Sequence, residues 1–211
     1  IRDRPRIVRA VEGTGTPLIR LSPGSALPGE VCVATNDREI CAEMTSYLAS
    51  LGHKRIAFIT GDPYHKAVTT RFDGYKDGLR ECGLKFSEKM VVAGDNSFDS
   101  GEAAGEKLLR RKRRPTAIFA ANDDMAAGVI RVANRLGIEI PRDLSIAGFD
   151  DVTLARLVFP NLTTIRQPLS EMAERAASIL VGNAKEQPTG TEVVPATIVV
   201  RESTGPAPGN A

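Results

Sequence analysis

Tryptophan is missing from this 211-residue chain, and aromatic residues make up only 5% of it, so aliphatic side chains must fill its core. The cysteines are few and form no CxxC pair, which predicts neither a disulfide framework nor a zinc cluster; they are Cys32, Cys41 and Cys82. A strong excess of one charge is also missing, because 28 Lys and Arg face 26 Asp and Glu. The charge balance therefore disfavours direct DNA binding by this chain.

Long apolar runs are absent as well. No stretch approaches the roughly 20 apolar residues that a membrane-spanning helix needs, and no signal-peptide-like run follows the basic first residues. We therefore expect no membrane association and no export, and a cytoplasmic location fits the cysteine usage. The chain begins at Ile1 rather than at an initiator methionine, so the sequence is compatible with a segment upstream of Ile1.

The common signatures of enzymes are missing too. The sequence contains no GxxxxGK[ST] phosphate loop, no GxGxxG, no GxSxG elbow and no HExxH motif. The acidic pairs at 123–124 and 150–151 fit helix N-caps as well as they fit metal ligands. The basic run 110–114 fits the C-terminal end of a helix, where cations interact favourably with the macrodipole. We predict no catalytic residues, no metal and no cofactor.

Short apolar runs alternate with longer amphipathic segments, which predicts an α/β fold with a parallel sheet and helices on both faces. The predicted strands are 17–21, 31–35, 55–60, 89–94, 116–121, 144–149 and 163–166, with one or two more in 193–201. The predicted helices are 37–51, 67–82, 100–111, 123–136 and 170–181, and 6–13 fits the end of another.

Residues typical of helix N- and C-caps support these boundaries. Glycines stand where a left-handed residue would end a helix; they are Gly52, Gly83, Gly137 and Gly182. Capping residues precede three helices; the candidates are Asn36 or Asp37, Asp99 or Ser100, and Asn122 or Asp123.

Ligands of open parallel sheets bind beyond the carboxyl ends of the strands, so a binding site is expected there. Polar residues follow four of the predicted strands; they are Asp62 to His65, Asn122, Asp150 and Gln167. Arg71 lies near the start of the helix that follows the first of these loops. A carboxylate, two amides and a guanidinium complement vicinal hydroxyl groups, and none of them resembles an activated nucleophile. The set predicts binding of a small molecule without turnover.

Five motifs in order resemble the effector-binding domain of the lactose/galactose repressor (LacI/GalR) family, and the resemblance runs from about Pro17 to Glu202. They are Leu51–Ile59, Arg71–Tyr75, Pro115–Ala126, Asp143–Asp151 and Leu162–Pro168. The resemblance implies a type I periplasmic-binding-protein-like fold with two α/β lobes and a sugar or sugar-like effector between them. It also implies a homodimer and a cytoplasmic transcriptional regulator.

The resemblance assigns ligand contacts to four residues, which are Arg71, Asn122, Asp150 and Gln167. His65 falls in a loop that also lines the cleft in this family. Phe149 adjoins the site, and either cleft lining or core filling explains it.

The resemblance also divides the chain. Residues 1–35 and 166–189 would form part of the N-terminal lobe, residues 36–165 and 190–204 the C-terminal lobe, and 205–211 a tail. The N-terminal lobe is incomplete, and the family's helix-turn-helix has no counterpart here, so operator DNA would be bound only through a segment upstream of Ile1. Two alternatives stay open: an exported sugar-binding protein of a transporter, marked by an upstream signal peptide, and a Rossmann-like or flavodoxin-like enzyme acting on a nucleotide or sugar phosphate.

Overall fold

The computed structural model describes residues 10–11, 14, 16–24, 30–182 and 190–209. Its strands are β1 (Ile19–Leu21), β2 (Val31–Ala34), β3 (Ile56–Thr60), β4 (Val91–Ala93), β5 (Ala117–Ala120), β6 (Ser145–Ala147), β7 (Thr164–Arg166), β8 (Gly190–Val193) and β9 (Thr197–Val199). Its helices are α2 (Asp37–Ser50), α3 (Lys66–Glu81), α4 (Phe98–Leu109), α5 (Asp123–Arg135) and α6 (Leu169–Val181), with 3-10 turns η1 (Glu88–Met90) and η2 (Thr153–Arg156). The helix end predicted at 6–13 lies mostly outside the described residues.

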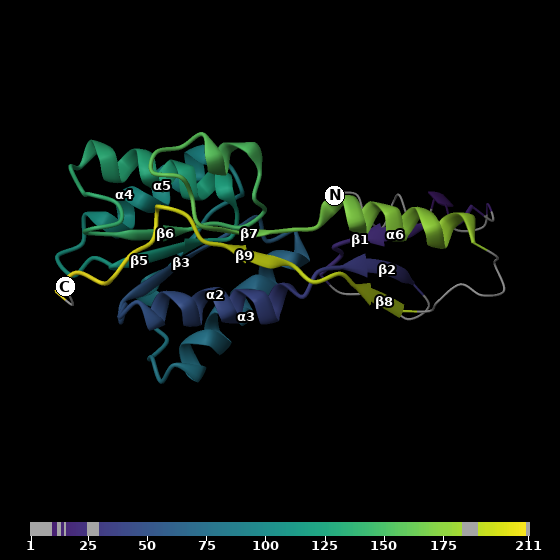
Figure 1. The fold of residues 1–211 in the computed structure, drawn as a ribbon, viewed down its shortest axis with the longest axis horizontal. Coiled ribbons are helices and arrows are strands. Elements are labelled where there is room, and N and C mark those ends of the chain that lie inside the picture. The colour runs from purple at the N-terminus through teal and green to yellow at the C-terminus, as the bar shows by residue number, and fades with distance from the viewer. Residues whose placement is uncertain (1–9, 12–13, 15, 25–29, 183–189, 210–211) are drawn as a thin grey trace.

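The larger unit is a parallel four-stranded sheet between two helix pairs (Figure 1). Its strand order is β4-β3-β5-β6, with α2 and α3 on one face and α4 and α5 on the other. The strand segment at β7 extends this sheet through parallel bridges from Ala147 to Thr163 and from Asp150 to Arg166. β7 in turn pairs antiparallel with β9. This is the predicted α/β architecture, and the fold class is confirmed.

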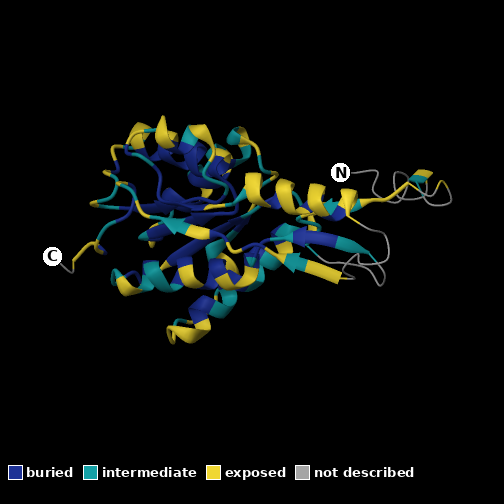
Figure 2. Ribbon diagram, turned by 45° about the vertical axis from the view of Figure 1, so that its right-hand side comes forward, coloured by how far each residue is buried: buried dark blue, intermediate teal, exposed yellow. Residues whose placement is uncertain are grey.

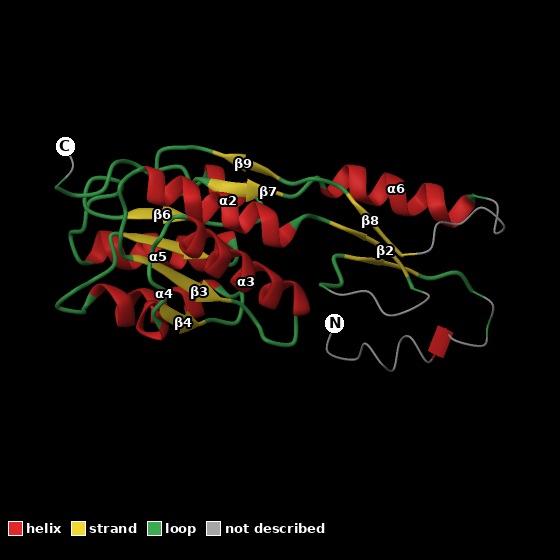
Figure 3. Ribbon diagram, turned by 90° about the horizontal axis from the view of Figure 1, so that it is seen from below, coloured by secondary structure: helices red, strands yellow, loops and turns green. Residues whose placement is uncertain are grey.

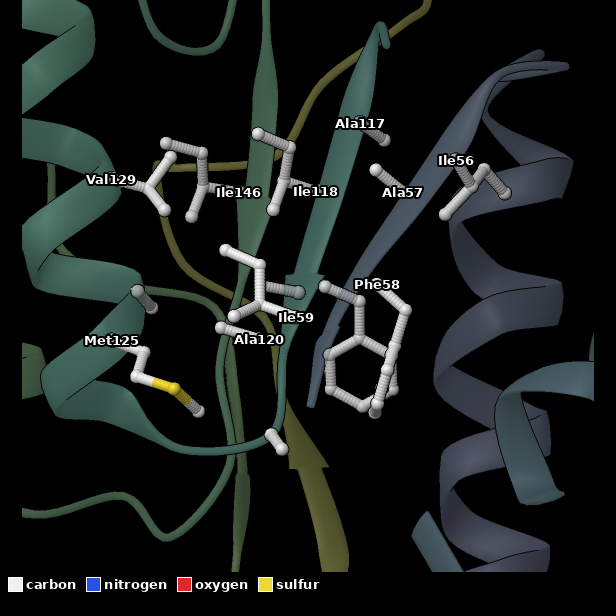
Figure 4. Close-up of a cluster of buried hydrophobic side chains, with 14 of the residues drawn as sticks. Ile56, Ala57, Phe58, Ile59, Ala117, Ile118, Ala120, Met125, Val129 and Ile146 are labelled. Atoms are coloured by element: carbon white, nitrogen blue, oxygen red, sulfur yellow. The ribbon is translucent and has the colours of Figure 1, made fainter. Parts of the chain in front are cut away.

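The core lies between this sheet and its helices (Figure 2). β3 and β5 are buried on both faces, which explains why they read as continuous apolar runs in the sequence. In Figure 4, Ile59 and Ile118 point toward Val129 of α5, whereas Phe58 points to the opposite face. There its ring stacks on that of Tyr75, with centroids 4.9 Å apart.

The helix boundaries depend on their caps, and two predictions about them were wrong. Gly52, Gly83 and Gly137 do adopt positive φ, but Gly182 has φ of −68° and ends α6 with an extended residue. The N-cap of α4 is Ser97, whose hydroxyl accepts from the backbone of Ser100, rather than Asp99 or Ser100. Asn122 caps α5 as expected.

The smaller unit is a parallel three-stranded sheet of order β1-β2-β8, with α6 packed against β1 and β2 (Figures 1 and 3). Buried Val33 and Met172 form the centre of this second core. The sequence places residues 190–204 with the larger unit, but that boundary is wrong for β8, because Val31 to Ala34 pair with Gly190 to Val193. The chain therefore returns to the larger unit only after Val193.

The C-terminal residues predicted as a tail begin with a docked segment. His53 is buried, and its Nε2 lies 3.1 Å from the carbonyl oxygen of Gly205 and 2.9 Å from Oγ of Ser145. The backbone N–H of Ala207 donates to the carbonyl of Leu51. His53 is thus a structural residue that fastens this segment to the sheet.

Candidate functional site

Arg71 is the centre of a polar cluster at the carboxyl-end edge of the larger sheet. It lies on α3, is only 8% exposed, and its Nε donates to Asp37 Oδ2 at 3.1 Å. Its Nη1 donates to the carbonyl of Ala121 at 2.7 Å, at the carboxyl end of β5. A buried guanidinium needs such partners, since an unpaired buried charge is strongly destabilising.

Asp150 approaches Arg71 from the turn after β6. Its Oδ1 lies 3.7 Å from Arg71 Nη1 and accepts from Nε2 of Gln167 at 2.6 Å. Burial raises the pKa of Asp150, and the Arg71 guanidinium and the Gln167 hydrogen bond oppose that rise. The structure thus joins three of the residues predicted from the sequence by ion pairing and hydrogen bonding.

Phe149 lies under the same guanidinium. Its ring is fully buried, and Cζ of Arg71 lies 3.6 Å from the ring centroid. The ring therefore belongs to the hydrophobic core and also contacts the polar cluster through a cation–π interaction. Of the two explanations that the sequence left open, the complete burial of the ring supports core filling, and cleft lining stays a prediction.

Asn122 is adjacent to the cluster but is already engaged. Its Oδ1 accepts from the backbone N–H of Met125 at 3.0 Å, and its Nδ2 donates to the carbonyl of Asn96 at 2.9 Å. An amide retains one further donor and one further acceptor position, so a ligand contact is compatible with these bonds. His65 is the N-cap residue of α3; its side chain is exposed and takes no part in the hydrogen bonds around Arg71.

Asp37 is a member of the cluster that sequence reasoning missed. It is the first residue of α2, it is buried, and its Oδ1 accepts a hydrogen bond from the hydroxyl of Thr35. The sequence offered it only as a helix cap, whereas its carboxylate instead pairs with Arg71. A carboxylate directly after a strand end was the signal that could have identified it.

A pocket of about 180 Å³ opens between the small sheet and the start of α3. It is lined by Ser22, Pro23, Gly24, Ala34, Thr35, Asp37, Ala67, Thr70, Thr191 and Val193. Asp37 is shared between this pocket and the Arg71 cluster. The hydroxyl oxygen of Ser22 is buried and has no hydrogen-bond partner within the described residues. The rest of the lining is apolar or glycine, and the four hydroxyl residues and the carboxylate of Asp37 are the side-chain groups that can exchange hydrogen bonds with a polyhydroxylated ligand.

Neither a candidate metal cluster nor a candidate membrane-spanning helix occurs in the described ranges. No group of three or more His, Cys, Asp or Glu residues there is arranged to hold a metal ion. No helix in that part of the chain has the length and apolar content to cross a bilayer.

Comparison with known proteins identifies the family to which the sequence and fold are similar. The family model described as a periplasmic binding protein-like domain matches residues 45–204. The HTH-type transcriptional regulator GalR of Escherichia coli K12 is 35% identical over 195 residues, which are 88% of this chain and 57% of GalR. The chain thus spans little more than half the length of that relative.

Solved structures of regulators share the fold. The complex of the transcriptional regulator CelR with cellobiose superposes with a TM-score of 0.84 at 30% identity, covering 93% of this chain and 62% of CelR. A LacI family regulator from Enterococcus faecium with bound ribose gives a TM-score of 0.87 at 27% identity, covering 96% of this chain and 76% of that one. The matching family model, the relatives and the shared fold together show that the chain belongs to the LacI/GalR family of transcriptional regulators and carries its periplasmic binding protein-like domain.

Proposed function

We propose that this chain is the effector-sensing region of a LacI/GalR-type regulator and that it binds a sugar or sugar-like molecule between its two lobes without turnover. The observation that supports this most is the position of Arg71, whose guanidinium joins Asp37 and Asp150 from different strand ends, with Asp37 also lining the adjacent pocket. Similarity to regulators, two of them solved with cellobiose or ribose, favours this function over an exported transport protein.

The proposed site contains Arg71, Asn122, Asp150 and Gln167, with His65 at its edge and Phe149 beneath it. Asp37 is added from the structure. Arg71 hydrogen-bonds to Asp37 and Gln167 to Asp150, and none of these groups is arranged as a nucleophile with an adjacent base, which supports binding without chemistry. We propose residues 1–35, 166–189 and the strand β8 as the partial N-terminal lobe, and 36–165 with the chain after Val193 as the C-terminal lobe.

Signalling would follow from closure of the lobes. A ligand shifts open and closed populations only by its differential affinity for the two states. The pocket contacts both units, because Ala34 and Thr191 belong to the small sheet while Ala67 and Thr70 belong to α3. A bound sugar that touches both walls would therefore favour the closed state and transmit the change to operator DNA through a helix-turn-helix upstream of this chain. We place this regulator in the cytoplasm, where its operator would lie.

We further propose a homodimer. Leu157 and Phe159 are 74% and 83% exposed, and Val152 on the same segment is 39% exposed. Large exposed apolar side chains that cluster on one segment are typical of an interaction surface. The segment follows the Asp150 turn directly, so a change at the effector would reach the subunit contact over a few residues.

Calorimetric titration with a panel of sugars, cellobiose and ribose included, tests the effector proposal. With a sugar that binds, Asp150→Ala should weaken binding by about 2 kcal/mol or more, because a buried hydroxyl pair loses its acceptor. The control is Glu81→Ala, which removes an exposed carboxylate from the last residue of α3 and should leave the affinity unchanged. Unchanged affinity in Asp150→Ala would remove Asp150 from the site, and a folded protein that binds no sugar would refute the effector class.

A further inference from the structure

Asp123 is a buried carboxyl group that the effector site does not use. It is the first residue of α5 and is 1% exposed. Its Oδ2 accepts from the backbone N–H of Val152 at 2.9 Å, and its Oδ1 accepts from the hydroxyl of Thr164 at 2.5 Å. One side chain thus joins the start of α5 to the turn after β6 and to the strand β7.

The turn that Asp123 holds is strained. Asp150 and Asp151 have φ of +117° and +57°, a region that residues other than glycine rarely adopt. Such a conformation persists only where the surroundings fix it. The N–H of Asp150 donates to the carbonyl of Ile165 before the strained pair, and the N–H of Val152 donates to Asp123 after it. Removal of either bond would free one end of the turn.

The close approach of Asp123 depends on Gly148. A Cβ atom at this glycine would lie 2.3 Å from Oδ1 of Asp123, a distance that no side chain tolerates. The same backbone is tied to β7, since the N–H of Gly148 donates to the carbonyl of Thr163. The local sequence Gly148 to Val152 therefore wraps around the carboxyl group.

We propose that Asp123 is a positioning residue that holds the Asp150–Asp151 turn and thereby keeps Asp150 within reach of Arg71 and Gln167. This inference rests on the proposed function only insofar as Asp150 contacts the effector. Asp123 is not among the residues that line the pocket, so its effect on binding would pass through the turn.

The protonation state of Asp123 makes the inference testable. Burial raises the pKa of Asp123 to about 7, and the hydrogen bonds from Thr164 and Val152 oppose the rise. The charged groups on the packed elements are Asp150 and Asp151 in the turn, Arg156 in η2, Arg166 in β7, Arg201 beside Asp151, and Asp124 on α5 itself. Of these, Asp150 and Asp151 raise the pKa of Asp123 further, because ionisation places a third negative charge beside theirs.

The direction of the pH dependence of turn opening follows from proton linkage. Opening the turn hydrates the carboxyl group and returns its pKa toward 3.8, so the closed turn binds the proton more tightly than the open turn. Raising the pH from 6 to 8 should therefore increase the equilibrium constant for opening the turn about tenfold. A protonated Asp123 can still accept from Val152 and can donate to Thr164, so the closed turn keeps both hydrogen bonds at low pH.

Amide hydrogen exchange on the 211-residue chain tests this without a ligand, because exchange reports local opening. After correction for intrinsic exchange rates, the protection of Val152 in the unmodified chain should fall about tenfold from pH 6 to pH 8. Asp123→Asn keeps the shape of the side chain and both hydrogen bonds but removes the charge, so the Val152 amide of this variant should stay protected at both pH 6 and pH 8. In Asp123→Ala the Val152 amide should lose its protection at both pH values. Asp124→Asn, on the exposed neighbour, should behave as the unmodified chain.

Two results would overturn the inference: an Asp123→Asn variant whose Val152 protection still falls with pH, or an Asp123→Ala variant with full protection. If the alanine variant does not fold, the comparison of the asparagine variant with the unmodified chain decides. Titration with the same sugar panel then separates the two proposals. If no sugar of the panel binds but the exchange pattern holds, the proposed effector class fails and the positioning role stands.

Discussion

Replacing Arg71 with methionine removes the guanidinium but keeps a side chain of similar length over the Phe149 ring. The change leaves Asp37, whose side chain is 6% exposed, without its cation, and Asp150, at 26%, without a nearby positive charge. Breaking a buried ion pair from one side costs about 3–5 kcal/mol. Because Asp150 is partly hydrated and has Gln167 as a partner, we expect a loss of about 3 kcal/mol in the free energy of unfolding.

Urea unfolding followed by far-ultraviolet circular dichroism measures this loss, since the chain lacks tryptophan. Arg71→Lys is the control: it keeps a cation, but one ammonium group cannot reproduce the planar fork that serves Asp37 and Ala121, so its loss should be intermediate. A loss below about 1 kcal/mol in the methionine variant would refute the reasoning that the carboxylates depend on this guanidinium.

The pH dependence of the same variant separates charge from packing. Burial raises the pKa of Asp150, and Arg71 opposes that rise, so removing Arg71 should raise this pKa further. A carboxyl group with a raised folded-state pKa binds more protons in the folded state, and it costs stability as the pH rises above its unfolded pKa. The deficit of Arg71→Met should therefore grow between pH 4 and pH 7. A deficit that is the same at all pH values would assign the loss to packing on Phe149.

Three further predictions concern the surface, the helix packing and the buried histidine. Phe159→Asp should shift a dimer toward monomer in sedimentation experiments without lowering the unfolding free energy, because the ring is exposed in the single chain. Gly101→Ala should cost about 1–3 kcal/mol in urea unfolding, since its methyl group would lie 2.2 Å from the carbonyl oxygen of Met125, whereas Gly105→Ala on the same helix, with 3.3 Å to its nearest atom, should cost less. Burial lowers the pKa of His53, so the unfolded state takes up the proton first and stability should fall as the pH drops below about 6.5; His53→Gln should flatten this dependence, and an unchanged slope would assign it to other groups.

The sequence predicted the sheet and helices well where local chemistry determines them. β3 and β5 are short apolar runs buried on both faces, and Asn122 caps α5. The assignment of residues 190–193 failed because strand pairing with β2 connects positions about 160 residues apart, and a four-residue strand carries no signal for its partner. The end of α6 at Gly182 failed because a glycine allows, but does not require, a left-handed residue.

The candidate site was predicted in part. Strand ends gave Asp150 and Gln167, and the motif on α3 gave Arg71, which the structure brings together. Asp37 was missed because an acidic residue at a helix start is adequately explained as a cap. Asp123 was also assigned only to a cap or a metal site; its bonds to Val152 and Thr164 depend on tertiary packing that spacing in the sequence does not reveal.

The order in which the strands are synthesised has a consequence for how the molecule assembles. The four strands of the larger sheet are complete at Ala147, whereas the three-stranded sheet needs β8, which ends at Val193. On a ribosome the larger unit can fold before β8 has been synthesised, while one edge of β2 is still unpaired. Pairing between strands so far apart in the sequence is slow. We expect the nascent chain to expose an unpaired β2 edge during this interval, so chaperones should bind, and misassembly should occur, mainly at the smaller unit.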